Sequence, residues 1–169
     1  MDSIAKNEFI VINFLVRNFS ERLTIRNIAA KLKLSAAGVH SILKKLENSK
    51  IVEAEKLGTG LFYRIGFNSP TARHLAAIVL LDFYKNDVPK EICELKKDVG
   101  AAVLQDNNLL LVTSLPTEPL KGFNVVALSS EELVNKFRDK DKEILSMIKE
   151  GIAVFGEDIV VNAIKEAVR

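Results

Sequence analysis

The chain has 169 residues, of which 48% are hydrophobic and 27% are charged, with 8 Gly and 4 Pro. This composition predicts folded domains with apolar cores and excludes a disordered or collagen-like chain. The net charge of +2 hides an asymmetry: residues 1–86 carry 13 Lys and Arg against 7 Asp and Glu, net +6, whereas residues 87–169 carry 11 against 15, net −4. A basic first half is what a phosphate-contacting surface would produce.

Membrane and cysteine chemistry are also constrained. The longest apolar run, Leu75 to Leu81, is far shorter than the roughly 20 residues that span a bilayer, and the start, MDSIAKNEF, lacks a signal-peptide pattern. We therefore expect a cytoplasmic protein with no membrane partner. Cys93 is the single cysteine, so one chain can form no internal disulfide and no cysteine-based metal site. We expect this thiol to be buried and inert.

The first half predicts three helices and a hairpin. Segment 4–19 is strongly apolar and predicts a helix with more hydrophobic surface than one core face needs. Residues 25–32 place apolar side chains at i, i+3, i+4 and i+7, which predicts a second helix. Ser35 is a good N-cap for a third helix, 35–48, with a buried stripe of Val39, Ile42, Leu43 and Leu46. Two strands in 51–66 then form a hairpin with its tip at Gly58-Thr59-Gly60.

Helix, turn, helix and hairpin in this order point to duplex DNA. The outer face of helix 35–48 is small at its start and basic further along, which suits a major groove about 12 Å wide. The run LTIRNIAAKLKLSAAGVHSILKKLENSKIVEAEKLGTGLFYRIG resembles the winged-helix domain of MarR-type and ArsR-type transcription regulators. The resemblance implies that helix 35–48 is the recognition helix and that hairpin 51–66 is the wing.

The residues expected to contact DNA lie on both helices and on the wing. They are Arg26, Ser35, Ala36, Ala37, His40, Ser41, Lys44, Lys45, Lys56, Thr59 and Arg64. Because Ala36, Ala37 and Gly38 stand where the family often has polar or basic side chains, we expect phosphate contacts to dominate affinity. Specificity would then depend on His40, Ser41, the wing and the spacing of a dimer.

A further apolar helix suggests that dimer. Ser69 and Pro70 predict a helix that runs to about Lys85 and is apolar around most of its circumference. A domain of about 85 residues has little room for two such helices, so we expect a homodimer through this helix and the helix in 4–19. The alternative is that both pack on the second domain. The polar segment 86–89 contains a proline and predicts a boundary between domains 1–86 and 87–169.

The second half predicts a small α+β domain, so the fold class is α+β: an N-terminal winged helix-turn-helix domain followed by a small α+β domain. Its expected elements are a helix in 89–97, strands 99–104 and 109–114 around a turn, a strand 123–128, one long helix from the Ser129 and Glu132 capping box to Gly151, a strand 152–155 and a helix from Asp158.

The order of these elements resembles the small nucleotidyltransferase-like domains that are widespread in archaea. In that family, two acids near the second strand and a third on a later strand hold two metal ions. Here Asp106 matches the first acid, Asn108 stands at the second, and strand 123–128 has no carboxylate. Two-metal catalysis needs several negatively charged oxygen ligands, so the resemblance implies this fold without activity. We expect no catalytic residue, cofactor or metal.

Three functions remain open at this point. The first is a homodimeric transcription regulator that binds double-stranded DNA, with an unknown effector or protein partner at its second domain. The second is a nucleotidyltransferase-like enzyme or nucleotide-binding protein. The third is a winged-helix module for protein interaction, because fold alone does not decide function; the net charge of +6 on residues 1–86 counts against it.

Overall fold

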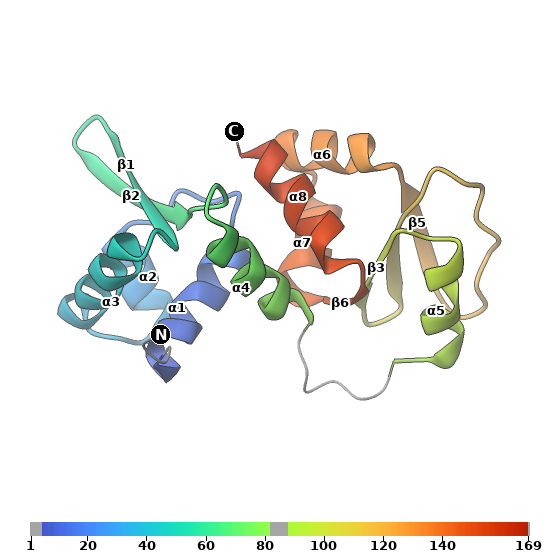
Figure 1. The fold of residues 1–169 in the computed structure, drawn as a ribbon, viewed down its shortest axis with the longest axis horizontal. Coiled ribbons are helices and arrows are strands. Elements are labelled where there is room, and N and C mark those ends of the chain that lie inside the picture. The colour runs from blue at the N-terminus through green and yellow to red at the C-terminus, as the bar shows by residue number, and fades with distance from the viewer. Residues whose placement is uncertain (1–4, 82–87, 169) are drawn as a thin grey trace. The chain divides into compact units, whose positions relative to one another are not determined.

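The computed structural model describes residues 5–81 and 88–168. The chain divides into two compact units, residues 1–76 and 77–169, and Figure 1 shows the elements of each. The division falls within helix α4, Pro70–Leu81. The domain boundary predicted at residues 86 and 87 lies outside the described residues and stays a prediction. None of the described helices is both long and apolar enough to cross a membrane.

The first unit contains the predicted helices and hairpin. Its elements are α1 (Lys6–Arg17), α2 (Ile25–Leu32), α3 (Ala36–Asn48), β1 (Val52–Leu57) and β2 (Gly60–Ile65). Helix α1 packs against α2, α3 and β2, with Val11, Ile12, Leu15 and Val16 buried. In α3 the predicted stripe is confirmed at Val39, Leu43 and Leu46, whereas Ile42 is half-buried. Figure 1 shows the hairpin as an arm that extends from the helices of this unit.

The second unit is a mixed sheet with helices on both faces. Its strands are β3 (Ala101–Gln105), β4 (Asn108–Val112), β5 (Asn124–Leu128) and β6 (Ile152–Phe155), in the order β5-β4-β3-β6. Strand β3 is antiparallel to β4 and β6, and β4 is parallel to β5. Helix α5 (Lys90–Glu94), followed by a 3-10 turn, Leu95–Lys97, lies on one face of the sheet, and α7 (Lys142–Glu150) and α8 (Glu157–Ala167) lie on the other (Figure 1).

The prediction of one long helix from Ser129 to Gly151 is wrong. The capping box is present, since Ser129 N donates to Glu132 Oε2 at 2.7 Å. However, helix α6 (Ser130–Arg138) ends at Arg138, and α7 begins at Lys142. Lys140 has a φ of 54°, in the left-handed region, and Asp141 Oδ1 accepts the N–H groups of Glu143 and Ile144. Asp141 therefore caps a new helix, which lets both segments pack on the sheet.

The expectation that Cys93 is buried is also wrong. This thiol is exposed on α5. The residue of α5 that enters the core is Ile92, which packs with Val99, Ala102 and Leu109. In so short a helix only one face meets the sheet. Cys93 follows Ile92 directly, so its side chain points about 100° away from that face.

Candidate nucleic-acid interface

Helix α3 is held in place by caps and by its apolar stripe. The Oγ of Ser35 accepts the N–H of Gly38 at 3.0 Å, which confirms Ser35 as the N-cap. The preceding turn reverses the chain at Lys33, whose φ is 54°, and Leu34 N donates to Ala29 O at 3.0 Å. Helix α2 begins at an N-cap, Thr24, whose Oγ1 accepts the N–H of Asn27 at 3.2 Å. This cap was not predicted from the sequence. These contacts set the starts of α2 and α3 and the turn between them.

The outer face of α3 carries most of the predicted contact residues. Ser35, Ala36, Ala37, His40, Ser41 and Lys44 are all exposed. Among the residues that the structure describes, the ammonium of Lys44 has no carboxylate partner within ion-pair distance. This face can therefore offer a positive charge and the imidazole and hydroxyl of His40 and Ser41 to a groove or a phosphate.

Lys45, the next residue, has a different environment. Its Nζ lies 2.8 Å from Oε1 of Glu8, in the first turn of α1. The Glu8 side chain is 10% exposed and that of Lys45 is 49% exposed. The hydrogen bond from Lys45 lowers the pKa of Glu8, burial acts to raise it, and the N–H of Ala5, 3.1 Å from Oε2, lowers it further. Sequence reasoning missed Glu8, because the pair joins residues that are far apart in the chain.

The wing presents two chemically different faces. In the hairpin register Lys56 lies opposite Leu61 and Ala54 lies opposite Tyr63; since paired residues share a face, Lys56 extends the face on which Tyr63 is buried. The other face carries Arg64, whose Nη2 is 3.5 Å from Oε2 of Glu53. The structure thus places Lys56 and Arg64 on opposite faces of the hairpin, and Arg64 beside an acid.

The remaining predicted residues are accessible but lie apart from the outer face of α3. Arg26 is exposed in the first turn of α2. Thr59 is exposed in the turn between β1 and β2, beside Gly58, whose φ is 59°. A phosphate backbone is long enough for such separated groups to contact it at different points, which is how wings and flanking helices usually position a recognition helix.

Comparison with known families agrees with this geometry. Residues 12–53 match the family of winged helix-turn-helix DNA-binding domains. The first unit therefore contains a winged helix-turn-helix DNA-binding domain. This domain indicates a DNA-binding regulator. The match runs from α1 through α3 to the start of β1. No curated protein and no solved structure matches the chain.

The second unit gives no support to the nucleotidyltransferase-like resemblance. Asp106 is exposed in the turn between β3 and β4, with a φ of 52°. At the position expected for a second acid, Asn108 Oδ1 accepts a hydrogen bond from Asn124 Nδ2 at 3.1 Å. Within residues 5–81 and 88–168 there is no group of three or more His, Cys, Asp and Glu side chains that could hold a metal.

Proposed function

We propose that this protein is a homodimeric transcription regulator that inserts helix 35–48 into the DNA major groove and uses hairpin 51–66 as a wing. The observation that carries the proposal is the outer face of α3, where Lys44 is exposed next to His40 and Ser41 within a match to a DNA-binding family. A dimer fits this reading, because a twofold protein presents two recognition helices to half-sites about one helical turn apart.

The salt dependence of binding tests the role of Lys44. Each lost phosphate contact should lower the slope of log affinity against log salt by about 0.9. We expect Lys44→Ala to weaken binding to a mixed-sequence duplex and to lower the slope by that amount. Lys142→Ala removes the same charge from an exposed position in the second domain and should change neither quantity. Equal affinity and slope for Lys44→Ala and the wild type would refute this role.

We also propose that the second domain is regulatory rather than catalytic. A groove of about 440 Å³ lies between α6 and α8 and is a site at which a small effector would fit; its polar lining includes Asn135, Arg138, Asn162 and Glu166. Calorimetry with ATP and Mg²⁺ separates this proposal from the nucleotidyltransferase-like alternative. Binding that disappears in Asp106→Ala would favour the alternative, and no heat of binding is the expected result.

A further inference from the structure

In residues 5–81 and 88–168, the part of the chain that the structure describes, strand β5 forms one end of the sheet in the second unit and pairs with β4 alone. Its sequence, Asn-Val-Val-Ala-Leu, has no charged residue and no proline. Exposed edge strands usually carry such residues or a bulge, which prevent pairing with another chain. Ala127 is exposed, and Val125 and Val126 are half-buried. This edge therefore lacks the common features that oppose strand addition.

Hydrogen bonds to β4 and its neighbours show which backbone groups of β5 point outward. Asn124 N donates to Asn107 O at 2.8 Å, and Leu128 O accepts from Thr113 N at 2.8 Å. Because the N–H and C=O of successive residues alternate between the two sides of a strand, the groups of Asn124, Val126 and Leu128 point toward β4. Those of Val125 and Ala127 point away from the sheet.

Both ends of this edge are closed by local hydrogen bonds. Phe123 N donates to Leu120 O at 3.1 Å, and Ser129 N donates to Glu132 Oε2 at 2.7 Å. The donors that remain for an added strand are those of Val125 and Ala127. A partner strand must present matching groups at the same spacing.

We propose that the partner is β5 of a second copy of this chain, paired antiparallel about a twofold axis at Val126. In this register Val125 of each copy lies opposite Ala127 of the other, and each residue donates one hydrogen bond and accepts one. A register centred on Val125 would need the N–H of Phe123, and one centred on Ala127 would need that of Ser129, both already bonded. The inference deepens the proposed function, since it rests on the homodimer and places its interface.

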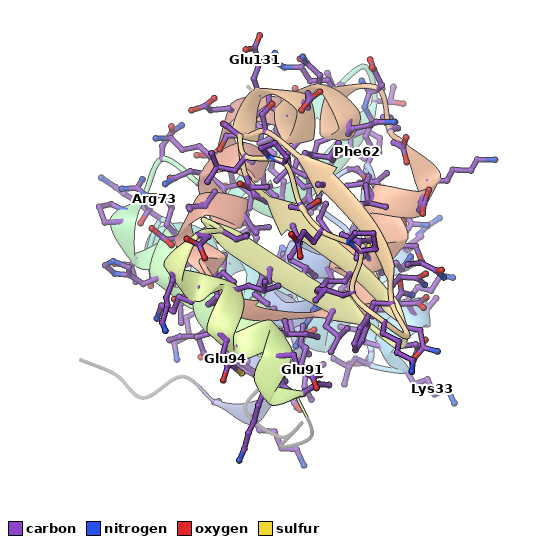
Figure 2. All side chains as sticks on the ribbon, turned by 90° about the vertical axis from the view of Figure 1, so that its right-hand side faces the viewer. Lys33, Phe62, Arg73, Glu91, Glu94 and Glu131 are labelled. Carbon is purple, nitrogen blue, oxygen red and sulfur yellow. The ribbon has the colours of Figure 1, made fainter. Side chains whose placement is uncertain are left out.

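Charges beyond the strand favour the same arrangement. Antiparallel pairing about Val126 places the start of β5 in one copy next to the end of β5 in the other. Lys121, which precedes β5, then lies near Glu131, at the start of α6 in the other copy. Lys121 and Glu131 are both exposed, and Figure 2 shows Glu131 pointing away from the protein at the start of α6. The two opposite charges occur once at each end of the seam, so the surface is self-complementary, as a twofold interface requires.

Amide hydrogen exchange on the unmodified chain tests the seam directly. The amides of Val125 and Ala127 should exchange rapidly in dilute protein and should become protected as the concentration rises through the range where dimers form. Those of Val126 and Leu128, bonded within the sheet, serve as internal controls and should stay protected throughout. Rapid exchange of Val125 and Ala127 in fully dimeric protein would overturn the proposal.

A proline at the edge supplies an independent test. Ala127→Pro removes an outward N–H that the β4 pairing does not use, and proline is tolerated in edge strands on that side. We expect it to be monomeric by sedimentation, whereas Ala127→Val, which keeps the N–H, should remain dimeric. Ile78→Lys alters the 40% exposed isoleucine of α4 and should also remain dimeric. A dimeric Ala127→Pro, or a monomeric Ile78→Lys, would move the interface away from β5.

DNA binding separates this inference from the proposed function. With a mixed-sequence duplex of about one helical turn, which accommodates a single recognition helix, Ala127→Pro should bind as tightly as Ala127→Val. A monomeric Ala127→Pro that fails to bind would contradict the assignment of DNA binding to α3 of each copy. Retained binding by a variant that is still dimeric would instead refute only the seam.

Discussion

The ion pair between Glu8 and Lys45 predicts that losing one partner destabilises the protein more than losing the other. Lys45→Met would leave a carboxylate without its ammonium at a side chain that is only 10% exposed, whereas Glu8→Gln would leave an ammonium on a side chain that is 49% exposed. Water can solvate the second group and hardly reaches the first. Removing the lysine should therefore destabilise the first domain more than neutralising the glutamate.

The magnitudes follow from that difference in exposure. A pair with a half-exposed partner is screened by solvent, so its net attraction is worth about 0.5 kcal/mol, and this is the expected cost of Glu8→Gln. A charged group left buried without a partner costs more, and we expect Lys45→Met to lose about 2 kcal/mol. The amide of the glutamine can still accept the N–H of Ala5, which in the wild type donates to Glu8 at 3.1 Å, so Glu8→Gln preserves the helix cap.

The stability difference between wild type and Lys45→Met should depend on pH, in a direction that follows from the pKa of Glu8. The pKa of Glu8 is lowered from its ordinary value of 4.5, first by the hydrogen bond from Lys45. A lowered pKa in the folded state contributes stability above 4.5, and this contribution is lost as the pH falls through the folded pKa. At low pH the carboxyl group is neutral and needs no ammonium. The difference between wild type and Lys45→Met should therefore narrow at acid pH.

Hydrogen exchange of the Leu43 and Leu46 amides measures this difference in the first domain alone, because both residues lie in the buried stripe of α3. The amides should show the loss of about 2 kcal/mol for Lys45→Met at neutral pH and a smaller loss at acid pH, where the carboxyl group is protonated. A cost no greater than that of Glu8→Gln, or a difference unchanged by pH, would refute the reasoning.

Three further predictions concern the second domain and helix α3. Asp141→Ala should lose about 1 to 2 kcal/mol in urea denaturation, while Asp141→Asn keeps the N-cap and loses less. Gly156→Ala should cost at least about 3 kcal/mol, because its Cβ would overlap the backbone of Gly100 and Ala101. Gly58→Ala, at a similar φ but with open space around it, should cost about 1 kcal/mol. Equal costs for the two variants would contradict the role of the overlap. His40→Ala should change the ranking of sequences selected from random DNA, and an unchanged ranking would remove His40 from base reading.

The elements of the first domain could be predicted because each has a local signal. The spacing of apolar residues in 25–32 and the Ser35 cap gave the two helices their correct limits, and the Gly58-Thr59 turn marked the hairpin. The break between α6 and α7 was missed because the apolar period continues across it from Phe137 to Ile144. The signal against continuation was Asp141, a good N-cap that an exposed helix interior would also tolerate.

The parts of the candidate nucleic-acid interface that depend on residues far apart in the chain could not be predicted. Lys44 and Lys45 are equivalent in the sequence, yet successive residues of a helix point about 100° apart, so one faces outward and the other faces α1. The identity of the residue that meets Lys45 depends on how α1 packs. Likewise, the separation of Lys56 from Arg64 follows from the hairpin register, which determines the face of each side chain but leaves no mark on composition or charge.

These placements constrain how the protein would distinguish DNA sequences. With Ala36, Ala37 and Gly38 at the start of α3, a single recognition helix offers few side chains that reach base edges, so discrimination within one half-site is expected to be small. In the proposed dimer, two helices joined through a short β5 seam would bind the second half-site at the high effective concentration that linkage gives. Spacing between half-sites would then contribute specificity that no side chain supplies. A weak seam would make affinity depend more strongly on the spacing of the half-sites. At the wrong spacing, two half-sites would bind two separate monomers and lose the gain in affinity that linkage gives.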